Sequence, residues 1–446
     1  MRTGSTARGI AATGAALLAL TACGGGGGSS DNTDKNAGAS SGGGKDVTNI
    51  YGTDGNMGTA LGDSFDKKGV LAGMKGTTPL TELSGDFKDR LKTVDPKLVD
   101  FNYSAETYDA IVITSLAAQM AGTSDATKFN AYVNGVTFGG DKCEDFTSCL
   151  DIINKGGNPD YDGFSGPLSF TDPGEPAQAS FGILQFNDDN VAEPKDYVIA
   201  GDEANAATDE GPAAVKQPAK ASDPLIIGTL LPQTGNLAFL GPPEVAGAKL
   251  AIQDINKAGG VLGQDVKLEE GDSGDTSTDT ASQTVDRLLQ KNVDAIIGAA
   301  SSGVSLTVID AITGAGVLQF SPANTSDEFT NYNDKNLYFR TAPPDVLQAR
   351  ALADLIIADG NNSVGILALN DPYGTGLAEN TKKNLIESGL AEGDITSIIY
   401  DPQAQNYDSE VQKMVQANPD AIVVIGFEES SRIIEGLNAQ GIGPQR

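Results

Sequence analysis

Residues 225–260 read LIIGTLLPQTGNLAFLGPPEVAGAKLAIQDINKAGG. They open with an almost unbroken apolar run, 225–231, of the kind that parallel sheets bury on both faces. The run leads into a segment in which apolar residues recur at helical spacing and which ends at two glycines, Gly259 and Gly260. The apolar positions of this segment are Val245, Ala248, Ile252 and Ile255. A buried strand that leads directly into an amphipathic helix predicts the first unit of a doubly wound α/β sheet.

The alternation of strand and helix continues beyond this unit. Further strands are expected at 265–273, 295–301, 317–323, 363–371, 395–401 and 421–427. Helices are expected at 280–290, 302–315, 346–359, 375–388, 408–416 and 430–440. The series restarts after NLYFRTAPPD, residues 336–345, and this predicts two doubly wound units joined at that segment.

The start of the chain has the pattern of an export signal. An apolar run, Gly9–Leu20, follows two arginines and is too short to cross a bilayer as a mature helix. It leads into LTAC, which ends at Cys23, and this is the lipoprotein signal pattern. We expect a signal peptide at 1–22, a lipid on Cys23 and a flexible tether over 23–45, which would hold the protein on the extracytoplasmic face of the cell membrane. The alternative is a membrane anchor with an incidental cysteine.

Two further cysteines, Cys143 and Cys149, lie close together in DKCEDFTSCLDI. Because an exported protein meets oxidising conditions, we expect a disulfide between them. The alternative is a metal site, but two thiolates without a histidine make an incomplete zinc site. We therefore expect no bound metal.

Composition excludes several classes of chemistry. The chain has 0 histidines in 446 residues, so Ser-His-Asp and Cys-His nucleophile systems and histidine metal sites are excluded. The formal net charge of -30 disfavours nucleic acid as a partner. The chemistry that this composition still allows favours a binding protein without a cofactor over an enzyme. The alternative enzyme would have to work with a pair of carboxyl groups, as a glycosidase does.

Composition also divides the rest of the chain into blocks. Residues 46–200 and 223–446 each have the length of a domain. Between them lies GDEANAATDEGPAAVKQPAKAS, residues 201–222, whose low complexity predicts a linker.

Five motifs of the second block resemble, in the same order, the landmarks of type I solute-binding proteins, and especially the branched-chain amino-acid receptors of ABC importers. They are GTLLPQTGNLAFLGPPEVAGAKLAIQDINKAGGVLGQDVKL, IIGAASSGVSL, QFSPANTSDEFT, YFRTAPPD and LNDPYGTGLAEN. The resemblance implies a two-lobed α/β fold in which each lobe is a doubly wound parallel sheet flanked by helices, with hinge crossovers between the lobes. It also implies a monomer that captures an amino-acid-like solute in the cleft and delivers it to an ABC permease. The alternative is a ligand sensor that signals through a partner protein.

The order of the two blocks is unusual for that family. Residues 47–65, 69–79, 104–122 and 161–188 resemble the family's carboxy-terminal part, including its closing hairpin, although they come first. The helix at 430–440 is followed by the turn signal Gly443-Pro444, which predicts a following strand, and 47–52 supplies one. We therefore interpret the chain as a circular permutant, with 223–341 in lobe 1, 342–446 in lobe 2 and 201–222 joining the family-type termini. The alternatives are an engineered or misassembled sequence and two unrelated half-domains.

Hydroxyl residues mark one end of the expected ligand site. Ser301 and Ser302 lie on the turn from a strand into a helix, and Thr325 follows the next strand. Hydroxyls and N–H groups at a helix N-terminus suit a carboxylate. The alternative is that these residues only cap helices.

The resemblance assigns roles to particular positions. It implies that Ser302 and Thr325 bind the ligand carboxylate, and that the Ala323 carbonyl and Asp54 bind its ammonium group. It also implies that Tyr373 closes over the ligand from lobe 2.

The same resemblance implies a mostly apolar pocket wall. Its members are Leu240, Ala300, Phe427 and Tyr108. The alternative for Phe427 and Tyr108 is that they are only core residues. An aliphatic amino acid is the leading expectation for the ligand.

Overall fold

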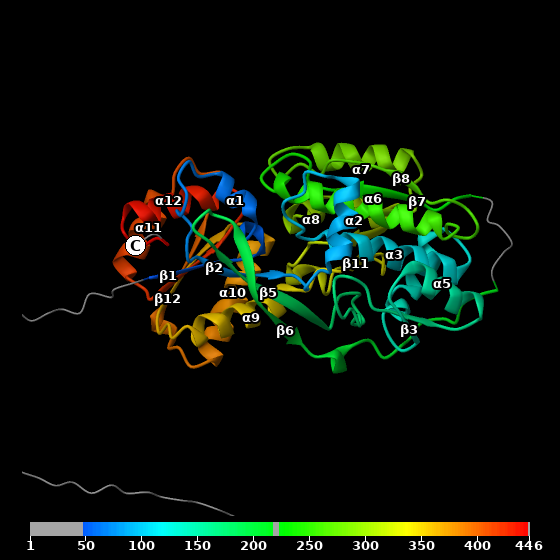
Figure 1. Cartoon of the computed structure of the whole chain (residues 1–446), viewed down its shortest axis with the longest axis horizontal. Coiled ribbons are helices and arrows are strands. Elements are labelled where there is room, and N and C mark those ends of the chain that lie inside the picture. The colour runs from blue at the N-terminus through cyan, green and yellow to red at the C-terminus, as the bar shows by residue number, and fades with distance from the viewer. Residues whose placement is uncertain (1–47, 217–222, 445–446) are drawn as a thin grey trace, which may run out of the picture. The chain divides into compact units, whose positions relative to one another are not determined.

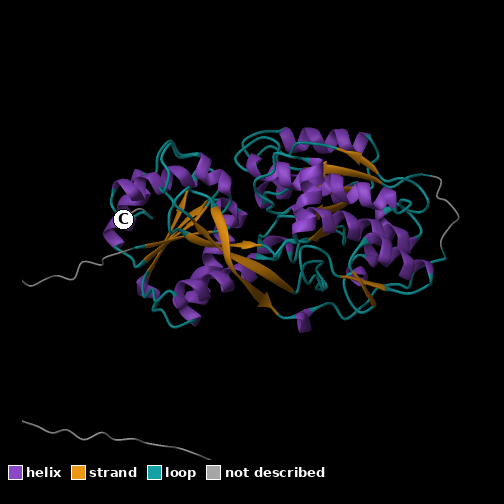
Figure 2. Ribbon diagram, viewed as in Figure 1, coloured by secondary structure: helices purple, strands orange, loops and turns teal. Residues whose placement is uncertain are grey.

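The computed structural model describes residues 48–216 and 223–444. The expected signal peptide, Cys23, the tether, Val47 and Arg446 lie outside the described residues. Two main sheets organise the described chain, one of five strands and one of seven (Figure 2). Lobe 1 here means the five-stranded sheet with its helices, and lobe 2 the seven-stranded sheet with its helices. None of the helices in the described part of the chain combines the length and the apolar character that a membrane span needs.

The sheet of lobe 1 is parallel throughout and has the strand order β11-β10-β9-β7-β8. Its strands are β7 (Ile226–Leu230), β8 (Lys267–Glu269), β9 (Ala295–Gly298), β10 (Leu318–Ser321) and β11 (Tyr338–Arg340). The helices packed around it are α2 (Gly85–Val94), α3 (Ser104–Ala121), α5 (Phe146–Asn154), α6 (Gly241–Lys257), α7 (Thr280–Gln290) and α8 (Ser302–Gly314). The apolar runs that predicted strands at 225–231, 295–301 and 317–323 therefore all form strands, because each run is buried from both faces.

Helix α3 brings the first block into the core of lobe 1. Its side chains are buried almost all round, and they share one apolar core with strands β7, β9 and β10 of the second block. Gly247 of α6 allows the two helices to touch, since a Cβ atom there would lie 2.2 Å from the Ser104 carbonyl oxygen. The side chain of Gln119 also accepts a hydrogen bond of 2.7 Å from the Leu262 N–H. The helix predicted at 104–122 thus packs on lobe 1, as expected.

The sheet of lobe 2 is assembled from both blocks, in the order β13-β12-β14-β1-β2-β5-β6. The second block gives β12 (Val364–Leu369), β13 (Ile395–Tyr400) and β14 (Ala421–Ile425). The first block gives β1 (Asn49–Gly52), β2 (Lys75–Pro79), β5 (Gln178–Phe186) and β6 (Ala192–Gly201). The helices are α1 (Thr59–Asp63), α9 (Asp345–Ala358), α10 (Pro372–Glu387), α11 (Asp408–Ala417) and α12 (Ser430–Ala439). Strand β1, blue in Figure 1, lies among the orange and red strands because it pairs in parallel with β14, from Asn49 opposite Ala421 to Tyr51 opposite Val423.

The edge of this sheet departs from a purely parallel arrangement. Strands β5 and β6 form an antiparallel hairpin, and β5 also pairs antiparallel with β2. The closing hairpin expected within 161–188 therefore lies further along the chain, at 178–201. The chain crosses between the lobes after β2, before β5, after β6 and after β11. The remaining elements are β3 (Asp141–Cys143), β4 (Pro159–Tyr161), α4 (Ala126–Phe129) and single 3-10 turns, of which η1 (Asp54–Asn56) follows β1.

The linker expected at 201–222 needs correction. Gly201 completes β6, and Glu203–Asn205 form a 3-10 turn. Farther on, the Ala207 N–H donates to the Phe170 carbonyl at 2.8 Å, and the Val215 N–H donates to the Met120 carbonyl at 2.9 Å. A polar, low-complexity composition does not prevent a segment from being held when its backbone donors find acceptors on a folded surface. Within this range only 217–222 lie outside the described residues.

Cys143 and Cys149 form the expected disulfide, with their Cα atoms 5.3 Å apart. The bond ties the end of β3 to α5.

Reduction of this disulfide is expected to lower the melting temperature by a few degrees without abolishing ligand binding. The closed ring is short, so the chain-entropy estimate is only about 2–3 kcal/mol. A thermal melt with and without reductant measures the shift, and the Cys143→Ser/Cys149→Ser variant should melt where the reduced protein does. Two free thiols in the mass spectrum of the untreated exported protein would contradict the bond.

Candidate functional site

A small cavity of about 20 Å³ is lined by residues of both lobes. Its lining residues are Asp54, Gly55, Tyr103, Leu237, Leu240, Ala300, Ser301, Ser302, Ala323, Thr325, Tyr373 and Phe427. Several of them follow the carboxyl ends of strands β1, β9, β10 and β14, which is where parallel α/β sheets place their binding residues.

One end of the cavity is formed by the start of α8. Ser301 is the N-cap, and its hydroxyl accepts a hydrogen bond of 3.3 Å from the Val304 N–H. Ser302 is the first helical residue, and its hydroxyl accepts a hydrogen bond of 3.3 Å from the Ser326 N–H. The helix N-terminus carries partial positive charge, and the hydroxyls can reorient to donate. This end therefore suits an anionic group such as a carboxylate.

The loop after β10 completes the same end. The Ser321 hydroxyl donates to the Ala299 carbonyl at 2.7 Å and accepts hydrogen bonds from the backbone N–H groups of Ala323 and Asn324, at 3.2 and 2.9 Å. Asn324 in turn donates from its side chain to the Ala300 carbonyl at 2.8 Å. The loop is thereby fixed against the turn before α8, with Ala323 and Thr325 in the cavity lining.

The opposite end of the cavity is acidic. Asp54 lies in the turn η1 directly after β1 and is only 6% exposed. Its carboxylate accepts hydrogen bonds from the hydroxyls of Tyr103 at 2.8 Å and Tyr373 at 2.9 Å, and from the Gln348 amide at 2.9 Å. Burial raises the pKa of the Asp54 carboxyl. Since these three donors are uncharged, the carboxyl group retains a strong preference for a cation, and an ammonium group fits it.

A second buried carboxyl group belongs to the same region. Asp345 is the first residue of α9 and is completely buried, and its N–H donates to the Thr325 carbonyl at 2.7 Å. Burial, followed by the negative charges of Asp54 and Asp327, raises the pKa of Asp345 well above its usual range. Buried carboxyl groups therefore lie in two places, at Asp54 in the cavity lining and at Asp345 next to the loop that carries Thr325.

The wall between the two ends is largely apolar. Leu240, Ala300 and Phe427 line it as the resemblance implied, together with Leu237. The Phe427 ring stacks on Tyr373 with centroids 5.5 Å apart and planes inclined by 8°. The Tyr373 hydroxyl also makes a hydrogen bond of 2.6 Å with the Thr53 hydroxyl. The ring of Tyr373 is thus held at both its face and its hydroxyl.

Tyr108 was expected in this wall, and the structure places it elsewhere. Its hydroxyl donates to Asp254 on α6 at 2.7 Å, and its ring packs edge to face on Phe87 of α2 at 5.6 Å. Tyr103, which precedes α3, lines the cavity instead. Helix α3 starts at Ser104, so Tyr103 lies at the end of the helix that faces the cavity, whereas Tyr108 lies more than a turn farther into lobe 1.

Sequence reasoning brought most of the lining residues together but missed some. The missed lining residues are Gly55, Tyr103 and Leu237. Asp345 and Gln348 were also missed, although the motif YFRTAPPD ends at Asp345. Gln348 gave no signal, because its role depends on a contact with Asp54 across 294 positions of sequence. Within residues 48–216 and 223–444, no three cysteine or acidic side chains are grouped so that they could hold a metal ion.

The comparisons with known proteins agree on one family. Residues 224–446 match the family model described as "Periplasmic binding protein". The Leu/Ile/Val-binding protein homolog 3 of Brucella melitensis biotype 1 is 27% identical over 214 residues, which are 47% of this chain and 56% of that protein. The Leu/Ile/Val-binding protein homolog 1 of Brucella suis biovar 1 is 29% identical over 225 residues, which are 50% of this chain and 59% of that protein.

The chain spans about half the length of the curated relatives it matches. Among solved structures, the substrate-binding protein LivJ of Streptococcus pneumoniae, in complex with isoleucine, is 25% identical with a TM-score of 0.43. That match covers 49% of this chain and 62% of LivJ.

Proposed function

Because the chain belongs to the type I periplasmic binding proteins, we propose that it captures a small α-amino acid between its lobes and delivers it to an ABC importer. The observation that carries this proposal is the polarity of the cavity. The α8 N-terminus with its hydroxyls lies at one end, and the buried Asp54 carboxyl lies at the other. A zwitterion has the matching pair of charges.

In the proposed complex, Ser302 and Thr325 bind the ligand carboxylate. The Ala323 carbonyl and Asp54 bind the ammonium group, and Tyr373 covers the ligand from lobe 2. Support comes from the position of all five residues in the lining of one cavity.

The ligand side chain would lie along Leu240, Ala300 and Phe427, which favours an aliphatic group. The names of the curated relatives, which are Leu/Ile/Val-binding proteins, agree with this preference. Branched-chain amino acids are therefore the first ligands to test.

Delivery to an importer implies an extracytoplasmic location and a permease as partner. We propose that the mature protein is a monomeric lipoprotein held by Cys23, with no catalytic activity of its own. The lipoprotein pattern of the first 23 residues supports the anchor.

We also propose that the chain is a circular permutant of the family. The family model covers 224–446, while residues 49–201 supply four strands of the lobe 2 sheet and residues 104–121 supply the central helix of lobe 1. These elements share the lobe 2 sheet and the lobe 1 core with the matched region, yet they precede it in the chain.

Titration calorimetry of the mature protein is expected to show binding of at least one of leucine, isoleucine and valine with micromolar or tighter affinity. 4-Methylpentanoate, which is leucine without its ammonium group, and isoamylamine, which is leucine without its carboxylate, should bind at least 100-fold more weakly than leucine, because each leaves a buried polar end unpaired at a cost of about 3–5 kcal/mol. Thr325→Val should weaken binding of the amino acid but not of isoamylamine. A protein that melts cooperatively and binds no α-amino acid in a panel of all twenty would contradict the proposed function.

A further inference from the structure

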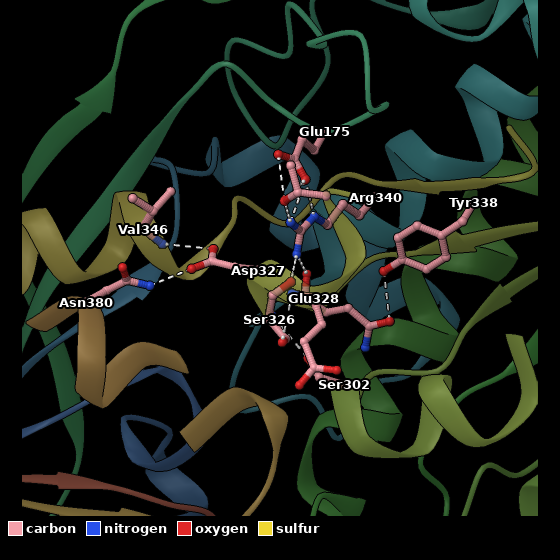
Figure 3. A network of polar contacts seen from close by, with 11 residues as sticks. Glu175, Ser302, Ser326, Asp327, Glu328, Tyr338, Arg340, Val346 and Asn380 are labelled. Carbon is pink, nitrogen blue, oxygen red and sulfur yellow. Dashed lines mark hydrogen bonds and ion pairs between the residues drawn. The ribbon is translucent and has the colours of Figure 1, made fainter. Parts of the chain in front are cut away.

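Arg340, on strand β11, is completely buried, and each of its five side-chain N–H groups has an acceptor. Its Nε donates to Glu175 at 3.0 Å, and one terminal nitrogen donates to Glu175 and to the Thr330 hydroxyl. The other terminal nitrogen donates to the carbonyl oxygens of Asn324 at 3.2 Å and Ser326 at 2.8 Å. Figure 3 shows the guanidinium between Glu175 on one side and the segment that carries Ser326 on the other.

The two carbonyl contacts fall on either side of Thr325, which lines the ligand cavity. The carbonyl of Thr325 itself accepts the Asp345 N–H at 2.7 Å. Three consecutive carbonyl groups of this loop are therefore held, two of them by one side chain. The Ser326 N–H also donates to the Ser302 hydroxyl, so the held loop is linked to the second residue proposed to bind the carboxylate.

The same loop continues into contacts with lobe 2. Asp327 accepts hydrogen bonds from the Val346 N–H of α9 at 3.3 Å and from the Asn380 side chain of α10. Figure 3 shows both donors on the side of Asp327 that faces away from Arg340. The position of the loop that carries Thr325 and Asp327 therefore affects both the lining of the cavity and a polar contact between the lobes.

We propose that Arg340, braced by Glu175, is the positioning residue for the carboxylate end of the ligand cavity. It acts through Thr325, by fixing the backbone on both sides of that residue. A buried ion pair adds little net stability, because the loss of hydration offsets the attraction between the charges, so its main effect is the geometry that it fixes. Lysine cannot replace arginine here, since an ammonium group is a single point charge and cannot reach acceptors on two sides. The inference rests on the proposed function only for the nature of the ligand.

The first test is a double-mutant cycle on the affinity for L-leucine, measured by calorimetry with the full chain. Arg340→Lys is expected to weaken leucine binding about tenfold or more, the usual size for a lost hydrogen bond to a charged group. In a Thr325→Val background it should weaken binding much less, because residues that act through one contact are not additive. In a Leu240→Val background, which alters the apolar wall, the full effect should remain. Equal effects in both backgrounds would overturn the positioning role.

The second test needs no ligand. Hydrogen exchange of the full chain, followed by mass spectrometry, should show about tenfold faster exchange for peptides covering 321–330 in Arg340→Lys, since local opening limits exchange there. Peptides from β12 should not change. Unchanged exchange at 321–330 would overturn the inference.

The two tests separate this inference from the proposed function. If the wild-type protein binds no amino acid, the proposed function fails, and the exchange result alone decides the role of Arg340. Should Arg340→Lys fail to fold, Thr330→Val takes its place in both measurements. It removes one acceptor of the guanidinium, so the same outcomes are expected at smaller size.

Discussion

Asp54→Asn should lower the affinity for the amino-acid ligand by roughly 100-fold or more. The expected cost is about 3–5 kcal/mol, the size found when one partner of a buried charge pair is removed. The substitution keeps the shape of the side chain. Tyr373 and Gln348 can still donate to the amide oxygen, and the Tyr103 hydroxyl, which donates to the other carboxylate oxygen, can accept from the amide nitrogen instead. The loss therefore reports the missing negative charge opposite the ligand ammonium. Calorimetry with the best ligand of the amino-acid panel measures it.

Asp359→Asn is the matched control. Asp359 is a partly buried carboxyl of the same lobe that pairs with Lys75 and accepts the Tyr51 hydroxyl at 2.6 Å, and it does not line the cavity. Its replacement should change the melting temperature and leave the affinity within about twofold, as expected for a site with no ligand contact. If Asp54→Asn binds as tightly as the wild type, Asp54 does not contact the ammonium group.

Expression of residues 46–216 and 223–446 as separate chains should give two insoluble products. The seven-stranded sheet would be cut between β14 and β1, leaving apolar strand edges without partners. Lobe 1 would lose helix α3, whose buried Ile111, Ile113 and Leu116 each contribute about 1.5–3 kcal/mol. These losses are comparable with the whole stability of a typical domain, roughly 5–15 kcal/mol.

Two further tests complete this experiment. Co-expression of the two stretches should restore soluble protein, because each supplies the missing half of both cores. A reordered chain, with 223–444 first and 48–216 second behind a short joint, should fold and bind the same ligand as the original order. If either stretch alone is monomeric and melts cooperatively, it has a core of its own, and the proposed permutation is wrong.

The sequence alone determined most of the alternating strands and helices of the second block. The helix expected at 280–290 has those bounds in the structure, and the run 225–231 became β7. Such elements can be predicted from the spacing of apolar residues, because that spacing depends only on residues close together in the sequence. The resemblance carried by the motifs of the second block was confirmed by the family match over 224–446. The pairing of Cys143 with Cys149 could also be predicted, because the two residues are close in sequence.

Only the tertiary structure decided which residues meet across long stretches of chain. It placed Tyr103 rather than Tyr108 in the cavity, because the start of α3 relative to the cavity depends on how that helix packs against α6. It also joined Glu175 to Arg340 across 165 positions. Such contacts produce no periodic pattern in the sequence, because they depend on how distant elements pack. The partner of such a side chain can therefore be identified only in the folded structure.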